Sequence, residues 1–297
     1  MPLKALRYFF VAAASSLLFW QLWRNWFLVN DAVSQLSWGF VGLALLTVFP
    51  VYFLAAFSWF LIIKQLGGKL PLRVSIQIWV MTNLSRYIPG VIWQYIGRVY
   101  WSNRAGLPAA ISTISLLLEI VFVVMAATLL ALLLVPWFKI STAIDLSFLP
   151  LLAIVVLLPL AMPQLFHRLI GVVSRVLHQG EVPPLVWPPS ASILIIPLYL
   201  VNFLLNGLSL FLLIRSLAPI SWEVLPAVVG MYAFSWLVGY VTIIAPGGIG
   251  ATELSLTFLL SFFVPAAVAV VAALLFRLLL IIAELVTFLV TMVMVKL

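Results

Sequence analysis

One long apolar stretch is interrupted by the segment Ala245-Pro246-Gly247-Gly248-Ile249-Gly250-Ala251-Thr252-Glu253. An earlier apolar stretch is interrupted in the same way by Arg86-Tyr87-Ile88-Pro89-Gly90-Val91-Ile92-Trp93. Proline removes a backbone donor and glycine permits conformations closed to other residues, so each Pro-Gly pair predicts a break in a helix. Broken apolar segments in corresponding positions of two halves are typical of a transporter's substrate site.

The composition is that of a membrane protein. Of its 297 residues, 66% are hydrophobic and 7% are charged, whereas a soluble domain carries about 25% charged residues. We therefore expect an all-α polytopic membrane protein, nearly all of it in lipid. The absence of cysteine excludes disulfides, thiolate catalysis and cysteine-based metal sites.

The net charge of +8 is spread through short loops and forms no basic tract long enough for nucleic acid. Positive residues in such loops set membrane orientation and contact anionic lipid headgroups. His167 and His178 lie eleven residues apart with Glu181 as the one nearby carboxylate, which does not predict a metal site. No cofactor is expected.

Apolar runs of about 20 residues predict full membrane spans. Six are expected, at residues 5–22, 39–63, 107–135, 148–163, 191–214 and 266–295. Two further hydrophobic stretches, 74–100 and 225–264, contain the Pro-Gly breaks. The positive-inside rule places both termini in the cytoplasm, and it keeps Arg98 and Arg104 there if the first broken stretch dips into the membrane and turns back. The expected location is the cytoplasmic (inner) membrane.

This path predicts an inverted-topology repeat, in which each half contains two spans, a broken re-entrant hairpin and a further span. The first repeat is residues 1–135, with its hairpin at 74–104. Residues 136–190 form an outside loop, the short span 148–163 and a basic cytoplasmic loop, and residues 191–297 complete the second repeat, with its hairpin at 225–264. Such repeats are used for alternating access. The two halves have opposite orientations in the membrane whether each broken stretch turns back as a hairpin or crosses fully as two tilted segments.

Charged residues inside spans cost roughly 2.5–3.5 kcal/mol each, so they usually face a protein interior. Glu119, Arg277 and Glu284 are of this kind. Arg277 and Glu284 are seven residues apart on one helix face, too far apart to pair, and Glu253 is the expected partner of Arg277. These charges indicate either a headgroup-binding or proton-linked cluster, or a structural ion pair that locks the two halves.

Near the breaks, Arg86 and Arg98 offer planar guanidinium groups that suit phosphate. The amides of residues 247–250 precede a new helix whose positive end favours an anion. Asn202 and Asn206, four apart within a span, are expected to bond between helices or to touch substrate. The candidate substrate-binding residues are Arg86, Pro89, Gly90, Trp93, Arg98, Glu119, Pro246, Gly247, Gly248, Gly250, Glu253, Arg277 and Glu284; no catalytic residue is expected.

At these motifs the chain resembles the flippase-like membrane family that includes the N-terminal domain of lysylphosphatidylglycerol synthases, the multiple peptide resistance factors. The resemblance covers nearly the whole chain, and its most specific part is the Pro-Gly-Gly-x-Gly-x-x-Glu element ending at Glu253. The family often has arginine just before that glutamate, where this chain has Thr252. The resemblance is also carried by Arg86-Tyr87-Ile88-Pro89-Gly90, Trp93, Gly97-Arg98, Gly106 and Glu119.

The resemblance implies a lipid translocator or a partner of lipid-linked glycan synthesis. Because the chain ends at Leu297, the soluble synthase domain is expected to be absent and aminoacyl transfer is not implied. The leading hypothesis is a transporter that moves an anionic amphipathic lipid between leaflets. The alternatives are an ion-coupled carrier of a small anion, and a non-catalytic membrane partner of a lipid-linked glycosyltransferase. An enzyme is not expected, because the spans hold no histidine and no paired carboxylates at catalytic spacing.

Overall fold

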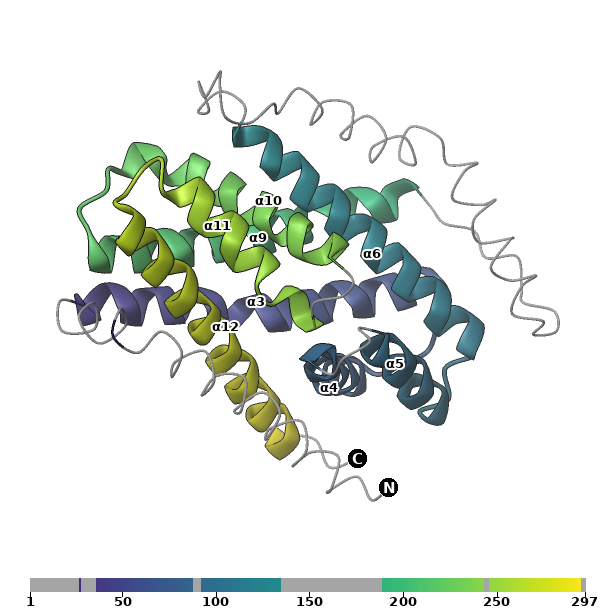
Figure 1. Ribbon diagram of the computed structural model, residues 1–297. Coiled ribbons are helices and arrows are strands. Elements are labelled where there is room, and N and C mark those ends of the chain that lie inside the picture. The colour runs from purple at the N-terminus through teal and green to yellow at the C-terminus, as the bar shows by residue number, and fades with distance from the viewer. Residues whose placement is uncertain (1–26, 28–35, 88–91, 135–188, 243–245, 295–297) are drawn as a thin grey trace.

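The computed structural model describes residues 27, 36–87, 92–134, 189–242 and 246–294. The expected spans at 5–22 and 148–163 lie outside the described residues, as do Pro89 and Gly90. Every regular element of the described part is a helix (Figure 1). In chain order these helices are α3 (Trp38–Gln65), α4 (Leu72–Asn83), the 3-10 helix η1 (Leu84–Tyr87), α5 (Trp93–Arg104), α6 (Ala109–Ala131), η2 (Leu132–Leu134), α9 (Pro189–Leu217), η3 (Trp222–Val224), α10 (Leu225–Val241), η4 (Pro246–Gly248), α11 (Ala251–Leu260) and α12 (Ala266–Met294).

Five helices in this part are long and apolar enough to cross a membrane. Four of them, α3, α6, α9 and α12, match the spans expected at 39–63, 107–135, 191–214 and 266–295. The fifth covers Trp222–Val241 and contains α10. The sequence predicted α10 as one limb of a broken hairpin, but with η3 it has 20 residues, or about 30 Å of helix, which is the thickness of the hydrocarbon core.

The helical interruptions fall where the Pro-Gly pairs predict them. Before and after the first pair, α4 and α5 have 12 residues each, or about 18 Å, which is too short to cross the hydrocarbon core. After the second pair, α11 has ten residues. Each broken stretch therefore contains at least one helix that is too short to cross the hydrocarbon core by itself.

Helices α3 and α9 pack along each other more extensively than any other pair in the described part. In the view of Figure 1, α3 crosses the middle of the molecule, with α4 and α5 below it and α10 and α11 above it. The last helix of each half packs against the other half: α6 contacts α9 and α10, and α12 contacts α3 and α4. The two halves are thus interleaved around the α3–α9 pair.

Polar side chains tie this apolar core together. On α9, Asn202 Nδ2 donates to the Val51 carbonyl of α3 at 2.8 Å, and Ser209 Oγ donates to the Ala44 carbonyl at the same distance. Tyr52 of α3 donates its hydroxyl to the Leu280 carbonyl of α12 at 2.7 Å. In lipid, such bonds hold helices together where burial of apolar surface does not.

Candidate functional site

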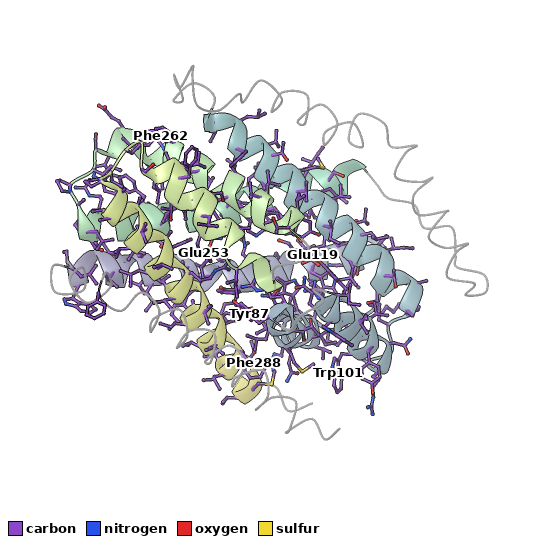
Figure 2. The ribbon with its side chains drawn as sticks, viewed as in Figure 1. Tyr87, Trp101, Glu119, Glu253, Phe262 and Phe288 are labelled. Carbon is purple, nitrogen blue, oxygen red and sulfur yellow. The ribbon has the colours of Figure 1, made fainter. Side chains whose placement is uncertain are left out.

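A cavity of about 230 Å³ lies where the two broken stretches meet. Its walls come from both halves of the described chain, and five charged side chains line it: Arg86, Arg98, Glu119, Glu253 and Arg277. In the view of Figure 2, Tyr87, Glu119 and Glu253 lie towards the centre of the molecule, while Phe262, Phe288 and Trp101 lie nearer its edge. Five charged side chains of the described part are therefore gathered at one place within the protein.

The second break forms a tight turn of glycines. Gly247, Gly248 and Gly250 have φ angles of +61°, +70° and +91°, a region that side chains with a Cβ rarely adopt. A Cβ on Gly247 would lie 3.3 Å from the ring of Tyr87, so the second break touches η1 of the first. The turn also packs on α10, because a Cβ on Gly239 would lie 2.0 Å from Thr252 Oγ1.

The first ion pair joins Arg98 of α5 to Glu119 of α6, both of them buried. The Trp79 indole donates to the other carboxylate oxygen of Glu119 at 2.7 Å. Arg98 Nε donates to Thr82 Oγ1 at 3.3 Å, and the guanidinium lies 5.2 Å from the Trp59 ring and 5.3 Å from the Trp79 ring. Protein groups thus surround the Arg98 guanidinium on several sides.

The second ion pair joins Glu253 of α11 to Arg277 of α12, which confirms the partner predicted for Arg277. The other oxygen of Glu253 accepts from the Gly250 N–H at 2.6 Å, and Arg277 Nη2 donates to the Gly247 carbonyl at 3.2 Å. The negative charge favoured at the start of α11 is therefore supplied by the chain itself.

The third ion pair joins the two halves directly. Glu284 of α12 is 1% exposed and accepts three hydrogen bonds from the first break. The donors are Asn83 Nδ2 at 2.6 Å, Arg86 Nη2 at 2.7 Å and the Tyr87 hydroxyl at 2.7 Å. Glu284 does not itself line the cavity; its role in this arrangement is to hold η1 against α12.

The Arg86 side chain is more exposed than those of the other two arginines. Its side chain is 25% exposed, against 3% for Arg98 and 8% for Arg277. Within the described residues, Arg86 Nε has no hydrogen-bond partner. The three arginines are balanced by three carboxylates, and the buried Arg86 Nε is a guanidinium donor left without a partner in the described part.

Of the remaining candidate substrate-binding residues, some line the cavity and others do not. Trp93 begins α5, is 47% exposed and does not line the cavity. Gly247 and Gly248 do line it, whereas Gly250 is outside the lining and begins α11 as its N-cap. In the described part, no group of three His, Asp or Glu side chains comes together to hold a metal ion.

Several lining residues were missed by the sequence reasoning. Tyr240 of α10 is one of them, and its hydroxyl lies 3.3 Å from that of Tyr95 of α5 at the cavity, so the pair joins the two broken stretches. From the sequence, Tyr95 was expected at the membrane interface. Tyr199 and Tyr232 line the cavity too, beside Asn202 and Asn206, which were noted but not assigned to the site. The signal that could have identified these residues in the sequence is a polar side chain within an otherwise apolar helix.

These features define a class: polytopic α-helical membrane proteins in which interrupted helices meet at an internal cavity lined by charged side chains. The chain belongs to the family described as the lysylphosphatidylglycerol synthase TM region, whose model matches residues 7–287. A search of curated proteins finds no match.

Proposed function

We propose that this protein is a lipid transporter, not an enzyme, and that it moves an anionic amphipathic lipid or lipid-linked intermediate between leaflets by alternating access. The observation that carries the proposal is the internal cavity with the partly exposed Arg86 at the meeting point of both breaks. A guanidinium binds a phosphate through paired hydrogen bonds, and Arg86 Nε offers one unused donor for it.

The size of the cavity fits a headgroup. Its volume of about 230 Å³ is below the roughly 300–1,000 Å³ of pockets that enclose drug-sized ligands. In the proposed transport step the headgroup occupies the cavity while the acyl or isoprenoid chains stay in the bilayer. This arrangement avoids carrying a bare charge through hydrocarbon.

Reciprocal contacts support an inverted repeat. Helices α6 and α12 each pack on the other half, and each also pairs with the short helix before it, through Arg98–Glu119 and Glu253–Arg277. The signs of the two pairs are exchanged, since the short helix carries the arginine in the first half and the glutamate in the second. We propose that the halves rock about the α3–α9 pair, in the inner membrane, with both termini in the cytoplasm.

The cavity volume also fits a small soluble anion, so an ion-coupled anion carrier is the second candidate. Purified protein in vesicles separates the two. We expect exchange of a fluorescent anionic phospholipid between leaflets, measured by quenching of the outer leaflet, to exceed that of protein-free vesicles. Uptake of radiolabelled phosphate with no lipid exchange would instead identify the anion carrier and reject the lipid transporter.

A further inference from the structure

One face of α9 presents polar groups to the cavity that the arginine cluster does not use. Tyr199, Asn202 and Asn206 are three, four and seven residues apart, so they share one side of the helix, and all three line the cavity. Tyr199 is 2% exposed and Asn206 is 3% exposed. Within the described residues, the Tyr199 hydroxyl and Asn206 Oδ1 have no hydrogen-bond partner.

The neighbours of the Asn206 side chain show which of its atoms is the nitrogen and which is the unpaired oxygen. The side-chain amide lies 2.9 Å from the Asn202 backbone carbonyl and 3.2 Å from Asn202 Oδ1. A backbone carbonyl only accepts hydrogen bonds, so the atom beside it is the amide nitrogen. The atom left unpaired is therefore the oxygen Oδ1, an acceptor. Phosphate or carboxylate oxygens cannot satisfy it, whereas a hydroxyl or an ammonium group can.

A corresponding tyrosine in α3 differs from Tyr199 in having a partner for its hydroxyl. The two long central helices contain the same pattern, Pro50-Val51-Tyr52 in α3 and Pro197-Leu198-Tyr199 in α9. The Tyr52 hydroxyl donates to the Leu280 carbonyl, while the Tyr199 hydroxyl is left unpaired. Buried polar groups without partners are costly and uncommon, so two on one cavity-lining face indicate a partner that arrives with a ligand.

We infer that the α9 face is a second subsite, which binds hydroxyl or ammonium donors on the lipid headgroup. The inference rests on the proposed function, and it narrows the substrate class to lipids that carry a hydrogen-bond donor beyond their anionic group. Arg86 takes the anionic group, and Asn206 Oδ1 and the Tyr199 hydroxyl take the donor. Both atoms are buried in this conformation, so the donor reaches them when the cavity opens in the proposed transport step.

Two lipids with the same phosphodiester charge and the same acyl chains provide the test. Phosphatidylglycerol carries two free hydroxyls beyond the phosphate, and phosphatidylmethanol carries none. Competition for the intact protein in detergent, read by native mass spectrometry, is expected to favour phosphatidylglycerol roughly threefold to tenfold, the range expected of one added hydrogen bond.

The Tyr199→Phe variant removes the unpaired hydroxyl without breaking a hydrogen bond of this structure, so it is expected to fold. It should reduce the preference for phosphatidylglycerol while leaving phosphatidylmethanol binding unchanged, and Asn206→Leu should do the same. The matched control is Tyr52→Phe, which loses the bond to Leu280 and should lower stability without altering the preference.

The outcomes separate the inference from the proposed function. If wild-type protein binds both lipids equally, or if Tyr199→Phe and Asn206→Leu both keep the full preference, the subsite is overturned and the lipid transporter stands. If neither lipid binds, the proposed function and the subsite both fail.

Discussion

At the scale of single residues, the three arginines of the cavity differ in how fully their guanidinium groups are used. Arg98 and Arg277 are buried against carboxylates, backbone and aromatic rings, whereas Arg86 keeps a quarter of its side chain exposed. Replacing one member of a buried pair leaves the other charge uncompensated, which destabilises a protein by about 3–5 kcal/mol. Loss of activity in an Arg98 or Glu253 variant would therefore report on folding as much as on substrate binding.

The Arg98–Glu119 pair is expected to contribute strongly to stability. Arg98→Met should lower the apparent Tm in detergent strongly, because Glu119 is left buried with a negative charge. Adding Glu119→Gln should recover most of the loss, since a neutral amide still accepts from the Trp79 indole. If the double variant is no more stable than Arg98→Met alone, the ion pair is not what holds α5 to α6.

At the scale of elements, the helices are held close by glycines at particular contacts. Gly207 lies where α9 meets α10, and a Cβ there would lie 2.7 Å from the Val229 Cα. Backbone cannot move aside as a flexible side chain can, so added volume at this point separates the two helices.

We expect Gly207→Ala to destabilise the protein by about 1–3 kcal/mol through overpacking, and to lower its apparent Tm. Gly42→Ala in α3 is the matched control, because nothing lies within 4 Å of a Cβ at Gly42. The gain in helix propensity should leave that variant as stable as the wild type or slightly more so. Equal effects of the two substitutions would mean that α9 and α10 are not in close contact at Gly207.

Much of the element order could be predicted from the sequence, because span length and Pro-Gly breaks act locally along the chain. Helices α3, α6, α9 and α12 and both interruptions were found in this way. The Arg277–Glu253 pair was also predicted, since few charges were available to choose from. Side-chain pairing was harder to predict. Polar residues do share one buried face of α6 (Ser112, Ser115, Glu119) and of α12 (Arg277, Glu284, Thr287). A shared face does not show which helix it meets, so the sequence did not predict that Glu119 would meet Arg98 or that Glu284 would meet Arg86.

At the scale of the whole molecule, alternating access requires the two broken stretches to move relative to each other. The Tyr95 and Tyr240 hydroxyls, 3.3 Å apart, join these stretches at the cavity. Because the chain has no cysteine, cysteines placed at both positions would be its only thiols.

Bridging these two cysteines with a flexible bifunctional reagent should stop lipid exchange, while the unbridged double variant and each bridging-reagent-treated single variant should keep it. The measurement is leaflet exchange in reconstituted vesicles before and after bridging. Exchange that continues at the same rate in fully bridged protein would show that transport needs no movement between these stretches.

The proposed transport depends most on Arg86 as the residue that receives the headgroup, and the leaflet exchange rate of an Arg86→Lys variant tests this role most directly. Lysine keeps a positive charge for Glu284 but loses the forked set of guanidinium donors, including the Nε donor that has no partner among the described residues. Charge-assisted hydrogen bonds contribute about 1.5–3 kcal/mol, so exchange of an anionic lipid below saturation should fall roughly tenfold to a hundredfold. Arg104→Lys, at an exposed arginine that contacts Tyr100, should exchange lipid at the wild-type rate. A folded Arg86→Lys variant with the wild-type exchange rate would contradict this role.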